Sequence, residues 1–177
     1  MCPPIETAPT GDGRLETALA NVSSALWGIR ELLELLTFKL ETEHVLVAAG
    51  RSRWLGRATH EVELVLEELR HAELRRTIEL GEVADALGID PDISLLELID
   101  EVPSPWDDVL TDHRESLLRS TTEITALAES NRQLLDSSYT ALKEALGLSS
   151  TTPEPSMYTA DGAASRPPTR RIFDQST

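Results

Sequence analysis

Apolar residues recur along this chain at alternating steps of three and four, in three long runs. The first run is Leu15, Leu19, Val22, Leu26, Ile29, Leu33, Leu36 and Leu40. The second is Leu55, Ala58, Val62, Val65, Leu69 and Ala72; Arg76 interrupts it, and Leu80, Val83 and Leu87 resume one residue out of step. The last is Trp106, Leu110, His113, Leu117, Ser120, Ile124, Leu127, Asn131, Leu134, Ser138, Ala141, Ala145 and Leu148. Side chains at this spacing share one face of an α-helix, which is buried against another helix. The pattern predicts an all-α fold, an elongated antiparallel bundle of three long helices plus a short helical turn.

Start and stop signals divide the chain into helices at about 14–48, 53–87, 94–100 and 105–147. Gly88 fits a helix C-cap, and Ser94 with Glu97 has the spacing of a capping box. Ser104 is expected to cap the last helix, with Pro105 at its first position. The predicted domains are a flexible N-terminal arm at 1–13, a helical bundle at 14–148 and a disordered Ser/Thr/Pro-rich tail at 149–177.

The last helix is predicted to be the longest. At 1.5 Å per residue it spans about 65 Å, against about 50 Å for each of the other two. About two turns at its end are therefore expected to project from the bundle, unless the connection from 88 to 104 covers them. Unpaired apolar surface of this kind is a binding site, a dimer contact or an aggregation liability. The apolar residues concerned are Ala141, Leu142, Ala145, Leu146 and Leu148.

The net charge of −15 lies entirely in the first 148 residues, because acidic and basic residues balance in the tail. A field of this sign repels phosphate backbones and argues against nucleic acid as a partner. It suits basic proteins or simply keeps the chain soluble. Cys2 is the only cysteine, so no intrachain disulfide forms. No stretch resembles a signal peptide or a membrane span, so we predict a cytoplasmic protein without membrane insertion.

Two Glu-x-x-His pairs, Glu41 with His44 and Glu68 with His71, have the spacing used by di-iron bundles. In an antiparallel hairpin the two pairs would lie roughly 20 Å apart, too far for one cluster. No nucleophile elbow, P-loop or dinucleotide fingerprint is present either. We therefore predict no catalytic residue, no cofactor and no metal. His113 is expected to be a satisfied, partly buried histidine, with a pH switch or a ligand as the alternatives.

Several other residues stand out on the predicted helices. Trp27, Trp54 and Trp106 are expected to seal the bundle, with partner recognition as the alternative. Gly28, inside a helix, predicts a close helix approach or a mild bend. Asn131 lies among leucines, where a buried amide fixes helix register. Contact with a partner chain is the alternative role for Asn131.

The run from Ser130 to Tyr139 resembles the Asn-x-x-Leu-Leu-x-x-Ser stretch in the last helix of FlgN-type flagellar export chaperones. Residues of the first two helices are similar as well: Leu33, Leu36, Glu43, Leu46, Leu66, Leu69, Glu73 and Arg76. The helix end Ala86-Leu87-Gly88-Ile89 matches the family's Leu-Gly-[Leu/Ile]. The tail is similar through Tyr158, Gly162, Arg170, Arg171, Ile172, Phe173 and Asp174. The resemblance spans about residues 30 to 174.

The resemblance implies a non-enzymatic cytoplasmic chaperone. Its clients would be the hook-associated proteins of the hook–filament junction, delivered to the flagellar type III export gate. It implies client binding by the end of the last helix: Asn131, Leu134, Leu135, Ser138, Tyr139, Leu142 and Leu146. Tail contacts, including the export apparatus, would fall to Tyr158, Arg170, Arg171, Ile172 and Phe173. Either Tyr139 or Tyr158 would dock at the gate.

Two other classes of protein remain open from the residues themselves. A coiled-coil adaptor or dimerisation module unrelated to flagella would self-associate through the third apolar run. A helical-bundle metalloenzyme would carry bound iron or manganese. We rank the chaperone first, the adaptor second and the enzyme a distant third.

Overall fold

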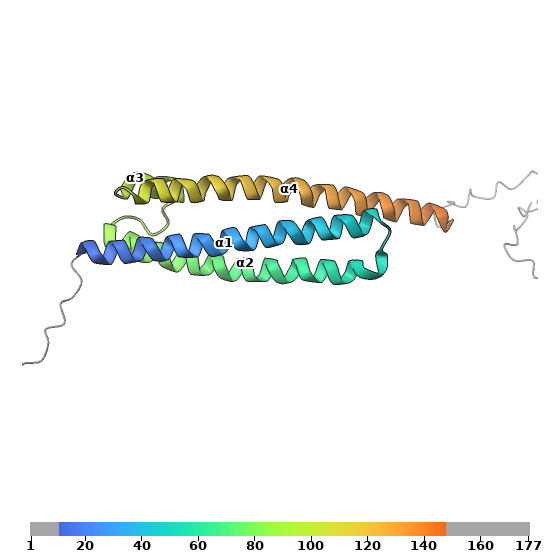
Figure 1. The fold of residues 1–177 in the computed structure, drawn as a ribbon, viewed down its shortest axis with the longest axis horizontal. Coiled ribbons are helices and arrows are strands. Elements are labelled where there is room, and N and C mark those ends of the chain that lie inside the picture. The colour runs from blue at the N-terminus through green and yellow to red at the C-terminus, as the bar shows by residue number, and fades with distance from the viewer. Residues whose placement is uncertain (1–10, 148–177) are drawn as a thin grey trace, which may run out of the picture. The chain divides into compact units, whose positions relative to one another are not determined.

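The structure is a computed structural model that describes residues 11–147, and the regular structure within that range is entirely helical (Figure 1). The elements are α1 (Gly11–Ala48), α2 (Ser52–Leu87), α3 (Leu95–Glu101) and α4 (Trp106–Ala145). No strand occurs among the described residues. The predicted all-α fold of three long helices and one short helix is confirmed.

The chain divides into two units. Met1–Ser137 forms the first, which holds α1, α2, α3 and most of α4, and Ser138–Thr177 forms the second. The predicted boundary between bundle and tail, after residue 148, lies outside the described residues. Helix α1 begins at Gly11, inside the predicted N-terminal arm, and Thr17 donates a hydrogen bond to the carbonyl of Gly13 in this first part of the helix. The disorder predicted for the rest of the arm and for the tail lies outside the described residues.

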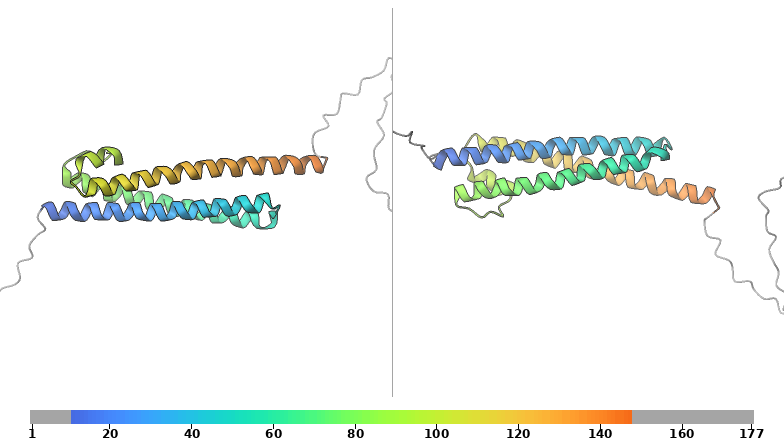
Figure 2. Two further views of the ribbon diagram at one scale, coloured as in Figure 1. Left: turned by 45° about the horizontal axis from the view of Figure 1, so that its top comes forward. Right: turned by 90° about the horizontal axis from the view of Figure 1, so that it is seen from below.

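Helices α1 and α2 form an antiparallel hairpin and lie side by side (Figure 2). A short turn joins them, with Gly50 in the left-handed region at φ 64°, which favours glycine. The buried positions are those of the predicted apolar runs, including Ala58, Val65, Ala72, Leu80 and Val83 on α2. The small side chains of Ala58 and Ala72 let the two helix backbones approach closely.

The connection from α2 to α4 folds over one end of the hairpin. Gly88 ends α2 at φ 70°, and the Ile89 amide donates to the Ala84 carbonyl over 3.0 Å. The predicted capping box is present, since the Ser94 hydroxyl accepts from the Glu97 amide and the Glu97 carboxylate accepts from the Ser94 amide. Leu98 of α3 is fully buried and completes the largest core cluster, which includes Leu19, Val22, Leu26, Val83 and Leu110.

Within the first unit, α4 runs parallel to α1 and antiparallel to α2. Its contacts with α1 advance together along both helices, from Ser23 with His113 to Leu40 with Asn131. The backbone of α4 lies farther from α2 than the backbone of α1 lies from α2. The seam residues Leu110, His113 and Asn131 are buried as the spacing predicts. A cis Ser104–Pro105 peptide precedes the helix.

The prediction that all three tryptophans seal the bundle is wrong for two of them, and one of the two roles predicted for Gly28 is not needed. Trp27 and Trp54 are 52% and 44% exposed, so they do not seal the bundle; only Trp106 packs against the core. Trp27 lies instead beside the polar groups of Arg30 and His113. A Cβ atom at Gly28 would meet nothing within 4 Å, so no close helix approach requires this glycine.

Candidate functional site

A buried polar network joins α4 to both helices of the hairpin. Asn131, 3% exposed, donates to the Leu40 carbonyl over 2.8 Å and to the Glu43 carboxylate over 3.3 Å. Its side-chain oxygen lies 2.8 Å from Nδ1 of His44. Since an amide oxygen can only accept, His44 donates in this contact. All of the amide's polar atoms are thus used inside the protein, which is the arrangement that fixes helix register.

Glu43 is the centre of this network and was not predicted as a site residue. It is 7% exposed and accepts from the Thr59 hydroxyl over 2.6 Å, as well as from Asn131. Within the described residues it forms no ion pair. Two neutral donors from α2 and α4 therefore solvate a buried acidic group of α1. The spacing of the first apolar run, continued three residues past Leu40, would have placed Glu43 on the buried face.

A second polar cluster joins α4 to α1 around His113, which is 1% exposed. Nε2 of His113 lies 3.0 Å from the Ser23 hydroxyl, and Nδ1 lies 3.4 Å from the Arg30 guanidinium. Arginine can only donate, so Nδ1 accepts and Nε2–H donates to Ser23. Arg30 also forms an ion pair with Asp112 at 2.8 Å and lies over the Trp27 ring. The histidine is therefore held neutral between the two helices.

Acid is expected to loosen this cluster. Burial, aided by the Arg30 charge and opposed by Asp112, lowers the pKa of His113 from its ordinary value of 6.5. The unfolded chain then binds a proton at a higher pH than the folded one, so stability falls as the pH drops through about 6.5. We expect the midpoint of unfolding to be lower at pH 5.5 than at pH 7.5. This decrease should be smaller in His113→Gln. An equal fall in both proteins would contradict this role of His113.

The residues predicted to bind clients differ in exposure along α4. Asn131 is buried, and Leu134 and Leu135 are half-buried. Ser138 is exposed, as are Tyr139 at 69%, Leu142 at 58% and Leu146 at 63%. The last four belong to the second unit. We call Tyr139, Leu142 and Leu146 the apolar stripe, since residues three or four apart share one helix face. Leu146 is the first residue after α4, and its amide donates to the Leu142 carbonyl over 3.0 Å.

Charged side chains lie on the turns of α4 that come just before this stripe. The Glu129 carboxylate accepts from both Arg132 and Gln133, and these hydrogen bonds lower the pKa of Glu129 to about 2. Arg132 also lies 3.6 Å from Asp136. The Glu129 carboxylate therefore stays ionised at every physiological pH. The predicted tail contacts at Tyr158, Arg170, Arg171, Ile172 and Phe173 lie outside the described residues.

No group of three or more His, Cys, Asp or Glu residues in the described part of the chain could hold a metal ion. The histidines of the two Glu-x-x-His pairs make other contacts. His44 belongs to the Asn131 network, and His71 lies 3.6 Å from Glu67 on the surface of α2. His60 pairs with Glu63 at 3.5 Å in the same exposed way.

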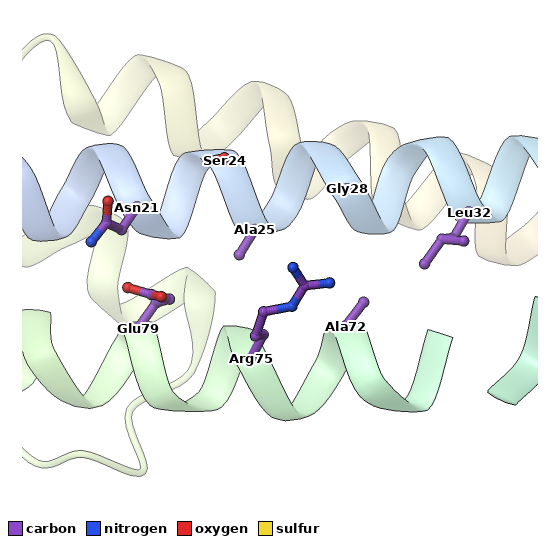
Figure 3. Close-up of a pocket in the computed structure, with 8 residues that line it drawn as sticks. All are labelled: Asn21, Ser24, Ala25, Gly28, Leu32, Ala72, Arg75 and Glu79. Atoms are coloured by element: carbon purple, nitrogen blue, oxygen red, sulfur yellow. The ribbon is translucent and has the colours of Figure 1, made fainter. Parts of the chain in front are cut away.

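Several hollows lie among the described helices, and a smaller and a larger one are lined by residues of the hairpin. The smaller, of about 240 Å³, lies between α1 and α2 over Ala25, Gly28 and Ala72, with Arg75 and Glu79 of α2 reaching towards α1 (Figure 3). The larger, of about 480 Å³, is bounded by all four helices and was not predicted. We call it the apolar groove; it is lined by Leu26, Ile29, Leu33, Leu36, Leu66, Leu69, Glu73, Arg76, Leu95, Leu117, Thr121, Ile124 and Thr125.

The structure combines long helices, polar clusters that hold them in register, and exposed apolar side chains. This combination is typical of the class of proteins that bind other proteins. Comparison with known families agrees. A family model described as "FlgN protein" matches residues 18–166, which is most of the chain. The chain therefore belongs to the FlgN family of flagellar export chaperones. No curated protein and no solved structure matches it.

Family membership settles the general class of activity. FlgN proteins are chaperones rather than enzymes, and they bind substrates of flagellar type III export. Among the described helices, none has an apolar stretch of the length that crossing a bilayer requires.

Proposed function

We propose that this chain binds hook-associated proteins of the hook–filament junction in the cytoplasm and delivers them to the export gate. Membership in the FlgN family supports the general role. The single observation that carries the finer proposal is the apolar stripe on α4, whose large side chains are more than half exposed. Large apolar groups at helical spacing suit the apolar face of a partner helix.

The residues of the proposed client site fall into three groups with different roles. The apolar stripe and Ser138 touch the client, and Leu134 and Leu135 extend the contact. Asn131 is buried, and its hydrogen bonds to α1 hold α4 in register within the first unit. The tail residues Tyr158, Arg170, Arg171, Ile172 and Phe173 add contacts with the client or the gate. Tyr139 and Tyr158 are both candidates for docking at the gate.

The test is co-purification of the full chain with each hook-associated protein of its own organism, followed by mass determination of any complex. We expect a soluble complex of defined stoichiometry with at least one of them. Well-folded junction proteins that form no complex would contradict the proposal. If the chain then proved self-associated, the coiled-coil adaptor would become the better interpretation.

A further inference from the structure

A further row of residues at helical spacing lies on α2, on a face that the bundle does not use. Its members follow one another in alternating steps of four and three, and all of them are exposed: His60, Leu64, Glu67, His71, Leu74 and Ile78. We call these six residues the outer seam. At 100° per residue they lie on the far side of α2 from the buried Val65, Ala72 and Val83. The core clusters of the described helices do not include them.

The apolar members of the outer seam form a regular row. Leu64, Leu74 and Ile78 are 51%, 64% and 65% exposed. Apolar side chains scattered singly over a surface are normal, whereas a row at this spacing is the pattern by which one helix packs along another. Between residues 60 and 78 such a contact runs for about 27 Å. A helix is therefore the occupant that fits the outer seam, and none of the described helices fills that place.

The polar members of the outer seam fit a second copy of the same seam. Two identical helices can pack antiparallel with their two-fold axis at the level of Leu69, and Leu64 then lies against Leu74 of the second copy. In the same arrangement Glu67 lies against His71 of the second copy. The Glu67 carboxylate accepts from the imidazole N–H of that histidine, so the two polar groups pair with each other. Two-fold symmetry makes each of these contacts twice.

The charges on the outer seam also select the direction of the pair. A parallel pair would bring like residues together, so Glu67 would face Glu67 of the second copy, and two carboxylates side by side are unfavourable. In the antiparallel pair, Glu67 keeps Arg70 of its own chain at 2.9 Å and gains a histidine of the second copy. The contact of 3.6 Å between Glu67 and His71 of one chain is exposed and stabilises little, so it does not compete.

We propose that this chain forms an antiparallel two-fold dimer in which the outer seams of two copies pack together. The layers of this contact are Leu64 on Leu74, Glu67 on His71 and Ile78 on His60. The contact lies within the first unit and uses neither the apolar stripe nor the buried polar networks, so it is independent of the proposed function. It also differs from self-association through the third apolar run, which belongs to α4. One pair of helices buries less area than a standard interface, so we expect a dissociation constant of about 0.1 mM.

The test is sedimentation equilibrium of the full chain from about 0.01 to 1 mM, together with two arginine variants. Leu74→Arg places a charge inside the dimer contact, whereas Leu118→Arg places the same charge on α4. The two leucines are a matched pair, since they are 64% and 52% exposed and neither belongs to a core cluster of the described helices. We expect Leu74→Arg to weaken dimerisation by about tenfold or more, and Leu118→Arg to change it by less than about twofold.

Cysteine cross-linking tests the direction of the pair, in a Cys2→Ser background. Across the antiparallel dimer, the sulfur of Leu64→Cys meets the sulfur of Leu74→Cys, whereas two copies of one variant hold their sulfurs about 15 Å apart along the helix axis. In a mixture of the two variants we expect disulfides to form at least about tenfold faster between them than within either one. Faster linkage within one variant would overturn the antiparallel pair.

The remaining outcomes are equally decisive. A chain that stays monomeric up to about 1 mM overturns the proposal and leaves the proposed function intact. Equal weakening by both arginine variants would assign the effect to added charge and overturns it as well. Client binding by Leu74→Arg is expected to match that of the unmodified chain. If that binding were lost while the unmodified chain stayed monomeric, the outer seam would hold the client instead of a second copy. Should Leu74→Arg fail to fold, the cross-linking result decides alone.

Discussion

Replacing Asn131 with alanine is expected to lower the free energy of unfolding by about 2 to 4 kcal/mol. The change removes one of the two donors to the buried Glu43 carboxylate and leaves the His44 Nδ1–H facing a void. Alanine favours helix more than asparagine does, which offsets only about half a kcal/mol of the loss. Chemical denaturation followed by circular dichroism measures the difference.

The neighbouring exposed residue gives the control for this prediction. Ser130→Ala lies on the same turn of α4 and should change stability by less than about 0.5 kcal/mol. Because Glu43 and Asn131 share one network, Glu43→Ala combined with Asn131→Ala should cost less than the sum of the two single changes. Additive losses would mean that the two side chains act independently.

Placing carboxylates on the apolar stripe is expected to weaken client binding by about a hundredfold. Leu142→Asp with Leu146→Asp replaces two exposed leucines, so the fold loses no buried contact. In a complex, however, two charges would be buried against an apolar partner, at a cost of several kcal/mol. Isothermal titration with the purified client measures the affinity, and the melting temperature should stay within about 2 °C.

Added negative charge alone could weaken binding, so a matched variant is needed. Ser137→Asp with Thr140→Asp adds the same charge on the opposite face of α4, as the helical period of 3.6 dictates. We expect it to bind the client within about threefold of the unmodified chain. Comparable losses in both double variants would assign the effect to net charge rather than to the stripe.

Most of the fold follows from the sequence, because burial in a helical bundle leaves a period of 3.5 to 3.6 residues. The apolar runs locate the buried faces of α1, α2 and α4, and local chemistry locates the turns at Gly50, Gly88 and Ser94. The start of α1 at Gly11 was missed, since two glycines there suggest a loop and helix ends are the least certain feature of any pattern.

The site was harder to predict, because it depends on distances between helices that no single run of residues encodes. Periodicity placed Asn131 on the buried face, but its bonds to Glu43 and His44 depend on the rotation of α1 against α4. Trp27 was predicted to be buried, yet its ring is half-exposed, with Arg30 over its face and the buried His113 at its edge. The apolar groove exists because α4 stays apart from α2, a spacing that hydropathy alone does not set.

The short connection from α1 to α2 and the longer connection from α2 to α4 affect the order in which the helices fold and open. The turn between α1 and α2 closes a short loop, whereas α4 must be brought back across a longer connection, which costs more chain entropy. The hairpin should therefore form first, and α4 should be the last helix to dock and the first to leave. Amide hydrogen exchange that is faster in residues 106–137 than in α1 would reveal this order, and equal protection would contradict it. A chaperone built in this way could expose the inner face of α4 while half of its structure remains folded.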